Sequence, residues 1–253
     1  MTMWLLMLFL WIHPESALVL QDRVFVSDIG AFGKPDGQIL EWQGEDQEPH
    51  PLARGLRDPK GMAPLGQGLV VADVDRLMWV SLQTGQVRPF ALPRAFPHPP
   101  RFLNDVTSSP EGTVYVSDTR ANRVYRLNAR GEVERWVEVP SPNGLWLEGD
   151  TLYVVSFTSP ARLYRIVNMG RPQLLHEFRF AMGGDGLARL TSGDFVVSGY
   201  LSGTLVLWAP SREERVIAED LTSPADLAVD TLHHRLIVPL LEAGQVITRP
   251  LPR

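Results

Sequence analysis

The chain has no cysteine among its 253 residues, which excludes disulfide frameworks, thiol nucleophiles and cysteine-ligated zinc together. It also has no run rich in Lys and Arg, and 24 basic against 29 acidic residues give a net charge of 24 − 29 = −5. This acidic balance argues against a nucleic-acid partner. The sequence contains neither G-x-S-x-G nor H-E-x-x-H, so a serine-elbow hydrolase and a zincin are excluded as well.

Long apolar runs are scarce, and the main one is the segment 1–13, which begins MTMWLLMLFLWI. These twelve residues, almost all of them apolar, are too few for a membrane span, which needs about 20, but they suit the core of a signal peptide. No basic residue precedes the run, and Pro14-Glu15-Ser16-Ala17 is not a convincing cleavage site. We therefore expect a periplasmic or secreted protein with no membrane span, and a cytoplasmic protein or an uncleaved apolar anchor as the alternatives.

Helical periodicity is absent outside that segment, whereas glycine and proline (21 of each) punctuate the chain into short runs. Six segments share one pattern, in which a short motif is followed by a strand, a tight turn and further strands. The second residue of each motif lies at position 15, 60, 104, 143, 185 or 225, with spacings of 45, 44, 39, 42 and 40 residues. A period near 40–45 with four strand-like runs is typical of a propeller blade.

The repeats predict an all-β fold, a six-bladed β-propeller with four-stranded antiparallel blades, formed by residues 14–253 as one domain. The last repeat ends after its third strand-like run (QVITRPL), so the sequence leaves open which segment closes the ring.

The repeat alignment also predicts a functional site. The first strand of a propeller blade lies beside the central channel, so equivalent residues at its start form a ring around the axis. That ring consists of Glu15, Lys60, Asn104, Asn143, Asp185 and Ala225. Two carboxylates and two amides on one axis offer hard oxygen donors that suit Ca²⁺, with a water-filled polar channel as the alternative.

The second strands end in Asp28, Asp73 and Asp118, which antiparallel pairing places near the same mouth. An Asp at this position commonly caps its own turn, and we interpret these three as structural.

The motifs also resemble a known family. The ordered phrases PES, PKGMA, FLNDV, PNGL, GDGL and SPADLAV resemble the senescence marker protein/gluconolactonase/LRE-like family, in particular its bacterial branch, over nearly the whole chain from Pro14 onward. The resemblance implies one divalent cation, usually Ca²⁺, at the channel mouth. Carried over by motif, its ligands are Glu15, Asn143 and Asp185, three members of the ring.

The resemblance further implies hydrolysis of a lactone or related ester, with a small-molecule substrate. Asn104 is expected beside the metal as a catalytic, substrate-binding or second-shell residue, and Asp185 is the candidate general base. Lys60 and Asp105 are candidates for substrate binding or second-shell contacts. The alternative function is a non-catalytic, NHL-like propeller that binds a small ligand or a protein partner.

This sequence departs from the family at three points of the site, one of which is Ser16 in place of the family's glycine after Glu15. Lys60 is uncommon chemistry for the rim of a metal site, because its charge opposes a nearby cation. Arg101 lies three residues before Asn104 rather than two, and strand alternation would turn it to the other face, so the sequence does not predict it as a substrate contact.

Overall fold

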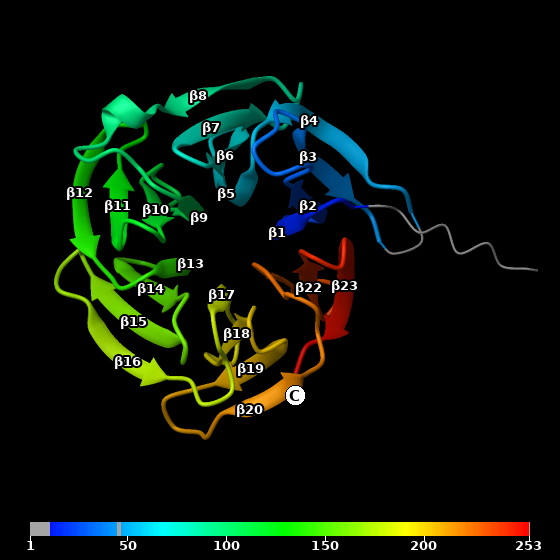
Figure 1. The fold of residues 1–253 in the computed structure, drawn as a ribbon, viewed down its shortest axis with the longest axis vertical. Coiled ribbons are helices and arrows are strands. Elements are labelled where there is room, and N and C mark those ends of the chain that lie inside the picture. The colour runs from blue at the N-terminus through cyan, green and yellow to red at the C-terminus, as the bar shows by residue number, and fades with distance from the viewer. Residues whose placement is uncertain (1–10, 45–46, 253) are drawn as a thin grey trace, which may run out of the picture.

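The computed structural model describes residues 11–44 and 47–252, and most of the predicted apolar segment 1–13 lies outside these ranges. Six antiparallel sheets follow one another around a central axis as the blades of a propeller (Figure 1), which confirms the predicted fold. Within the described residues, no helix is long and apolar enough to cross a membrane.

The strands of the first three blades run outward from the axis in chain order. The first blade consists of β1 (Pro14–Leu20), β2 (Arg23–Asp28), β3 (Gly37–Trp42) and β4 (His50–Leu56). The second consists of β5 (Pro59–Leu65), β6 (Gly68–Asp73), β7 (Arg76–Ser81) and β8 (Val87–Ala91). A short 3-10 helix (Pro93–Ala95) leads to the third, with β9 (Leu103–Ser108), β10 (Val114–Asp118), β11 (Arg123–Leu127) and β12 (Val133–Glu138).

The last three blades repeat the arrangement, but the sixth sheet has three described strands. The fourth blade consists of β13 (Pro142–Glu148), β14 (Thr151–Ser156), β15 (Arg162–Val167) and β16 (Gln173–Glu177). The fifth consists of β17 (Gly184–Arg189), β18 (Phe195–Gly199), β19 (Thr204–Trp208) and β20 (Arg215–Ala218). The sixth consists of β21 (Ala228–Asp230), β22 (Arg235–Leu240) and β23 (Gln245–Pro250). No fourth described strand joins this sheet, in keeping with the short last repeat.

The hydrophobic core is divided among the blade interfaces. Each of the six neighbouring pairs of blades buries its own apolar cluster, in which strand residues of one sheet face those of the next. Phe25 and Leu69, for example, meet between the first two blades, and Phe195 and Val155 meet between the fourth and fifth. A single blade cannot bury both of its faces, so closure of the ring completes the core.

The ring closes where the first blade meets the sixth. Trp11 is 7% exposed and packs with Val24, Ile237 and Val246 from the two blades. The backbone amide of Asp226 donates to the carbonyl oxygen of Glu15 at 3.0 Å. The segment just before Pro14 is therefore part of the folded propeller.

Candidate functional site

A bulge aims the motif residues of five blades at the channel. In the first blade, Pro14 pairs with Asp28 but Ser16 pairs with Ser27, so one extra residue, Glu15, is left between them. The same break in register falls at Lys60, Asn104, Asn143 and Asp185 in the next four blades. A bulge leaves a residue outside the ladder and redirects its side chain, which explains why these positions bear polar residues on strands that are otherwise apolar.

The serine near the end of three second strands supports the bulge. The hydroxyl oxygens of Ser27, Ser117 and Ser198 accept hydrogen bonds from bulge amides at distances of 2.7–3.0 Å. Because an unpaired buried amide is costly, these hydroxyls stabilise the distorted start of the inner strand.

The aspartates that end the second strands hold the neighbouring backbone. Asp28 accepts hydrogen bonds from the amides of Ile12 and His13, and Asp118 accepts them from Arg101, Phe102 and Ala121. Asp73 accepts hydrogen bonds from two backbone amides in the same way. Their structural interpretation is therefore confirmed, although they fix the segment before the inner strand more than their own turn.

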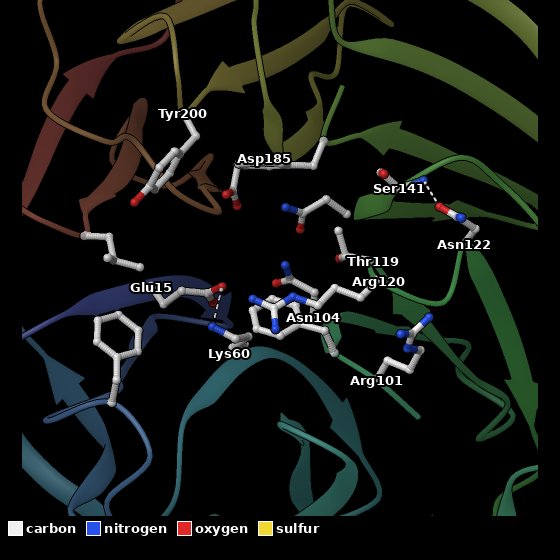
Figure 2. Close-up of a pocket in the computed structure, with 15 residues that line it drawn as sticks. Glu15, Lys60, Arg101, Asn104, Thr119, Arg120, Asn122, Ser141, Asp185 and Tyr200 are labelled. Carbon is white, nitrogen blue, oxygen red and sulfur yellow. Dashed lines mark hydrogen bonds and ion pairs between the residues drawn. The ribbon is translucent and has the colours of Figure 1, made fainter. Parts of the chain in front are cut away.

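The five polar ring residues surround a cavity of about 690 Å³ at the mouth of the channel (Figure 2). Glu15, Lys60, Asn104, Asn143 and Asp185 are all 6% exposed or less and line this cavity together. The structure thus brings together the three predicted metal ligands with Asn104 and Lys60. The sixth ring position, Ala225, is fully buried and offers no donor.

Asp105 occupies a different place from the other candidates. It lines a second cavity of about 210 Å³ together with Asp226, not the cavity at the mouth. Its two carboxylate oxygens accept hydrogen bonds of 2.6 Å from the backbone amides of Val106 and Leu145. These contacts tie the inner strand of the third blade to that of the fourth.

Burial dominates the ionisation of the ring. It raises the pKa of Glu15 to about 7, against the opposing charge and hydrogen bond of Lys60. The pKa of Asp185 lies well above its usual value, first because of burial and then because of the charges of Glu15 and Asp226. Burial likewise raises the pKa of Asp226 to about 7. The positive charge around these carboxylates is therefore too small to offset the cost of burying their charged forms.

The donor set fits a hard cation. Oε2 of Glu15 and Oδ1 of Asp185 are fully buried and have no hydrogen-bond partner among the described residues. Oxygen atoms of this kind are costly to bury unless they bind something. Within residues 11–44 and 47–252, no group of three or more His, Cys, Asp or Glu side chains is placed to bind a metal, so amide oxygens such as that of Asn143 would complete the protein ligands.

Lys60 is the feature of the ring that opposes a metal. Its Nζ lies 3.7 Å from Oε1 of Glu15, and both side chains are at most 6% exposed. Lys60 therefore neutralises part of the charge that a cation would otherwise bind.

Several lining residues were not predicted from the sequence. Thr119, Phe157, Tyr200 and Leu241 all line the cavity, and each directly follows the second strand of its blade. The repeat alignment contained this signal, because the residue after each second strand occupies the same place around the mouth.

Arg101 also lines the cavity, whereas the sequence predicted that its side chain would point to the other face of the strand. It lies two residues before β9 begins, so strand alternation does not determine the direction of its side chain.

Comparisons with known proteins agree on the fold. No family model matches the chain, and no curated protein matches it in sequence. Among solved structures, the chain resembles XC5397 from Xanthomonas campestris, described as a gluconolactonase, with a TM-score of 0.75 and 18% identity over 96% of this chain and 88% of that chain. It also resembles virginiamycin B lyase from Staphylococcus aureus, with a TM-score of 0.65 and 14% identity over 96% and 85%.

A chain in a nidogen/laminin complex is similar too, with a TM-score of 0.72 and 12% identity over 86% of this chain and 88% of that chain. Proteins described as a gluconolactonase and a lyase thus share this architecture with a chain of a nidogen/laminin complex. At such low identities the likeness establishes the propeller fold alone.

Proposed function

We propose that this protein is a hydrolase of lactones or related esters that uses one divalent cation, Ca²⁺ by preference, at the mouth of the channel. The observation that carries the proposal is the pair of buried, unpartnered carboxylate oxygens of Glu15 and Asp185, which face one cavity from two different blades. The similarity in fold to a protein described as a gluconolactonase supports the same class of reaction.

Glu15, Asn143 and Asp185 would hold the cation, with water completing the roughly 6–8 ligands that Ca²⁺ takes. When bound, the cation supplies a Lewis acid that polarises the substrate carbonyl. The two carboxylates and the amide are oxygen donors, which Ca²⁺ prefers to nitrogen or sulfur.

Asp185 is the general base of the proposed reaction. Burial raises the pKa of its carboxyl group, and a carboxylate with a raised pKa is the stronger proton acceptor. Asp185 takes a proton from water as the water oxygen bonds to the acyl carbon. The bond between the acyl carbon and the ring oxygen then breaks, and the proton passes from Asp185 to the departing oxygen, which leaves a hydroxy acid.

Asn104 and Lys60 orient the groups around that step. Asn104 is 6% exposed and offers both an amide donor and an acceptor to a substrate in the cavity. Lys60 holds the Glu15 carboxylate through its 3.7 Å ion pair, so that Glu15 faces the cavity in one orientation. Asp105 contributes indirectly by holding the backbone beside Asn143.

The test combines metal binding with turnover of a lactone panel. We expect saturable Ca²⁺ binding by calorimetry and hydrolysis that stops when a chelator removes the cation. Asp185→Asn should lower kcat/KM by at least about 100-fold, the range for loss of a general base. Asp194→Asn is the control. Asp194 directly precedes β18 in the fifth blade and is buried, but it does not line the mouth cavity, so this variant should keep the wild-type rate. Equal, chelator-insensitive rates for the wild type and Asp185→Asn would overturn the proposal.

The second candidate is a non-catalytic propeller that binds a ligand through the same mouth, and the Lys60–Glu15 pair favours it. An ammonium group already beside Glu15 can take the place of a metal as counter-charge. Thermal unfolding separates the two functions, because binding to the folded state raises the melting temperature. No increase in millimolar Ca²⁺ would support the binding protein.

A further inference from the structure

On the side of the third blade, the wall of the mouth cavity contains Arg101 and Arg120, and neither forms an ion pair within the described residues. Lys60, Arg101 and Arg120 line the cavity, against Glu15 and Asp185 as the acidic lining residues. Lys60 is paired with Glu15 at 3.7 Å, so the two arginines are the lining cations left without an ion pair among the described residues. The chain as a whole has a net charge of −5, so this cationic wall is a local feature.

Arg120 is the exposed cation that points into the cavity. Figure 2 shows its side chain extending toward Glu15 and Lys60, whereas Arg101 lies at the edge. Within the described part of the chain, the guanidinium of Arg120 has no ion pair and no hydrogen bond, and it lies over the ring of Phe102, 4.5 Å from the ring centroid. The Nζ of Lys60 lies 4.9 Å from the same centroid.

Two cations therefore share one aromatic ring. The negative face of a ring attracts each cation, whereas the two like charges repel each other. An anionic group placed beside Arg120 would reduce that repulsion and accept the free hydrogen bonds of the guanidinium.

The loop that carries Arg120 is held in position. The Asp118 carboxylate accepts hydrogen bonds from the amides of Phe102 and Ala121 on either side of the stack. The hydroxyl of Thr119 donates to the carbonyl oxygen of Pro142 at 2.8 Å, which joins the loop to the fourth blade. These hydrogen bonds fix the backbone at both ends of the loop, so the position of Arg120 at the cavity is preorganised for binding.

We propose that the cavity binds a lactone bearing a second, anionic group, a carboxylate or a phosphate, which lies against Arg120 while the ester faces Glu15, Asn143 and Asp185. This inference rests on the proposed hydrolase function and names its substrate class. Phe157, Tyr200 and Leu241, from the fourth, fifth and sixth blades, line the rest of the cavity and would contact the apolar face of the substrate.

The test compares three substrates that share one ring: a neutral sugar lactone, its 6-phosphate, and a sugar lactone with a terminal carboxylate. In the wild type, at least one anionic lactone should have a higher kcat/KM than the neutral one, and the phosphate and carboxylate arms identify which anion is used. Arg120→Gln should reduce the ratio of anionic to neutral kcat/KM by about 10- to 100-fold, as expected for a charged hydrogen bond. Added salt should reduce the same ratio.

Arg88→Gln is the matched control. Arg88 stacks on Trp79 at 4.2 Å and lines a different cavity, so its removal deletes the same charge and the same kind of contact without touching the mouth. The ratio should be unchanged in this variant. Equal kcat/KM for neutral and anionic lactones in the wild type, or an unchanged ratio in Arg120→Gln, would overturn the inference.

A binding measurement separates this inference from the hydrolase function. Calorimetry in a chelator compares glucose 6-phosphate with glucose, neither of which is a lactone. Saturable binding of the phosphate that weakens at least tenfold in Arg120→Gln would support the anion site even if no lactone were hydrolysed. Hydrolysis of lactones without any preference for an anion, and without binding of glucose 6-phosphate, would leave the hydrolase function in place and refute the anion site.

Discussion

At the scale of single residues, the pairing of Lys60 with Glu15 bears most directly on the proposed metal site. Its ammonium lies 3.7 Å from Oε1 of Glu15, while Oε2 of Glu15 has no partner within the described residues. One oxygen of the Glu15 carboxylate thus pairs with the Lys60 ammonium, and the other oxygen is free to bind a further group. A cation at the proposed site would compete with Lys60 for the same charge, so the lysine would weaken metal binding while it stabilises the metal-free ring.

Replacing Lys60 with methionine should therefore tighten Ca²⁺ binding by about tenfold or more, because a nearby positive charge is removed. The metal-free protein should become less stable, since the buried Glu15 then has no partner, and Ca²⁺ should raise its melting temperature further than in the wild type. Calorimetry and thermal unfolding measure both effects. Lys34→Met, at an exposed lysine that does not line the mouth, is the control, and an equal affinity in all three proteins would contradict the competition.

At the scale of the element, the inner strand positions its polar residue by close packing against the next blade. Gly144 follows Asn143, and a Cβ atom at this position would overlap the carbonyl oxygen of Asp185 and lie 2.8 Å from the amide nitrogen of Leu187. The glycine therefore permits β13 and β17 to approach closely enough for Asn143 and Asp185 to share one cavity. This close contact explains why the residue after Asn143 in the PNG motif is a glycine.

Gly144→Ala should force the two inner strands apart, cost about 1–3 kcal/mol of unfolding free energy, and weaken Ca²⁺ binding as well. Urea unfolding and calorimetry measure the two effects. Gly149→Ala is the comparison, because a Cβ there meets no atom within 4 Å although φ is +59°. That variant should lose some stability from its backbone conformation but keep its metal affinity. Unchanged Ca²⁺ binding in Gly144→Ala would contradict the coupling between strand packing and the site.

At the scale of the whole molecule, the site depends on closure of the ring. Glu15 comes from the first blade and Asp185 from the fifth, and the sixth blade lies between them with three described strands. Trp11 packs across the junction of the first and sixth blades, and the hydroxyl of Ser16 donates to Oδ2 of Asp226 at 2.5 Å. Residues 11–13 therefore contribute to the closure, and signal cleavage after Ala17 would remove both Trp11 and Glu15.

Trp11→Ala should open this junction and lower the unfolding free energy by about 3–5 kcal/mol, the usual cost of truncating a buried tryptophan. Thermal and urea unfolding measure the loss. Trp136→Ala is the control, because Trp136 is 37% exposed and should cost much less. If both variants were equally stable, closure would not depend on Trp11. If the protein is exported, N-terminal sequencing of the mature chain should find Trp11 still present.

The sequence by itself determined the number of blades, their order and the ring of Glu15, Lys60, Asn104, Asn143 and Asp185. It did so because each blade repeats one pattern, and equivalent residues in a closed ring must face one axis. Only the tertiary structure decided what surrounds those residues. It shows that Lys60 pairs with Glu15, that Asp105 lines a second cavity rather than the mouth, and that Arg120 lies over the ring of Phe102. These depend on distances between different blades and on loop conformation, and neither is encoded in a repeat period.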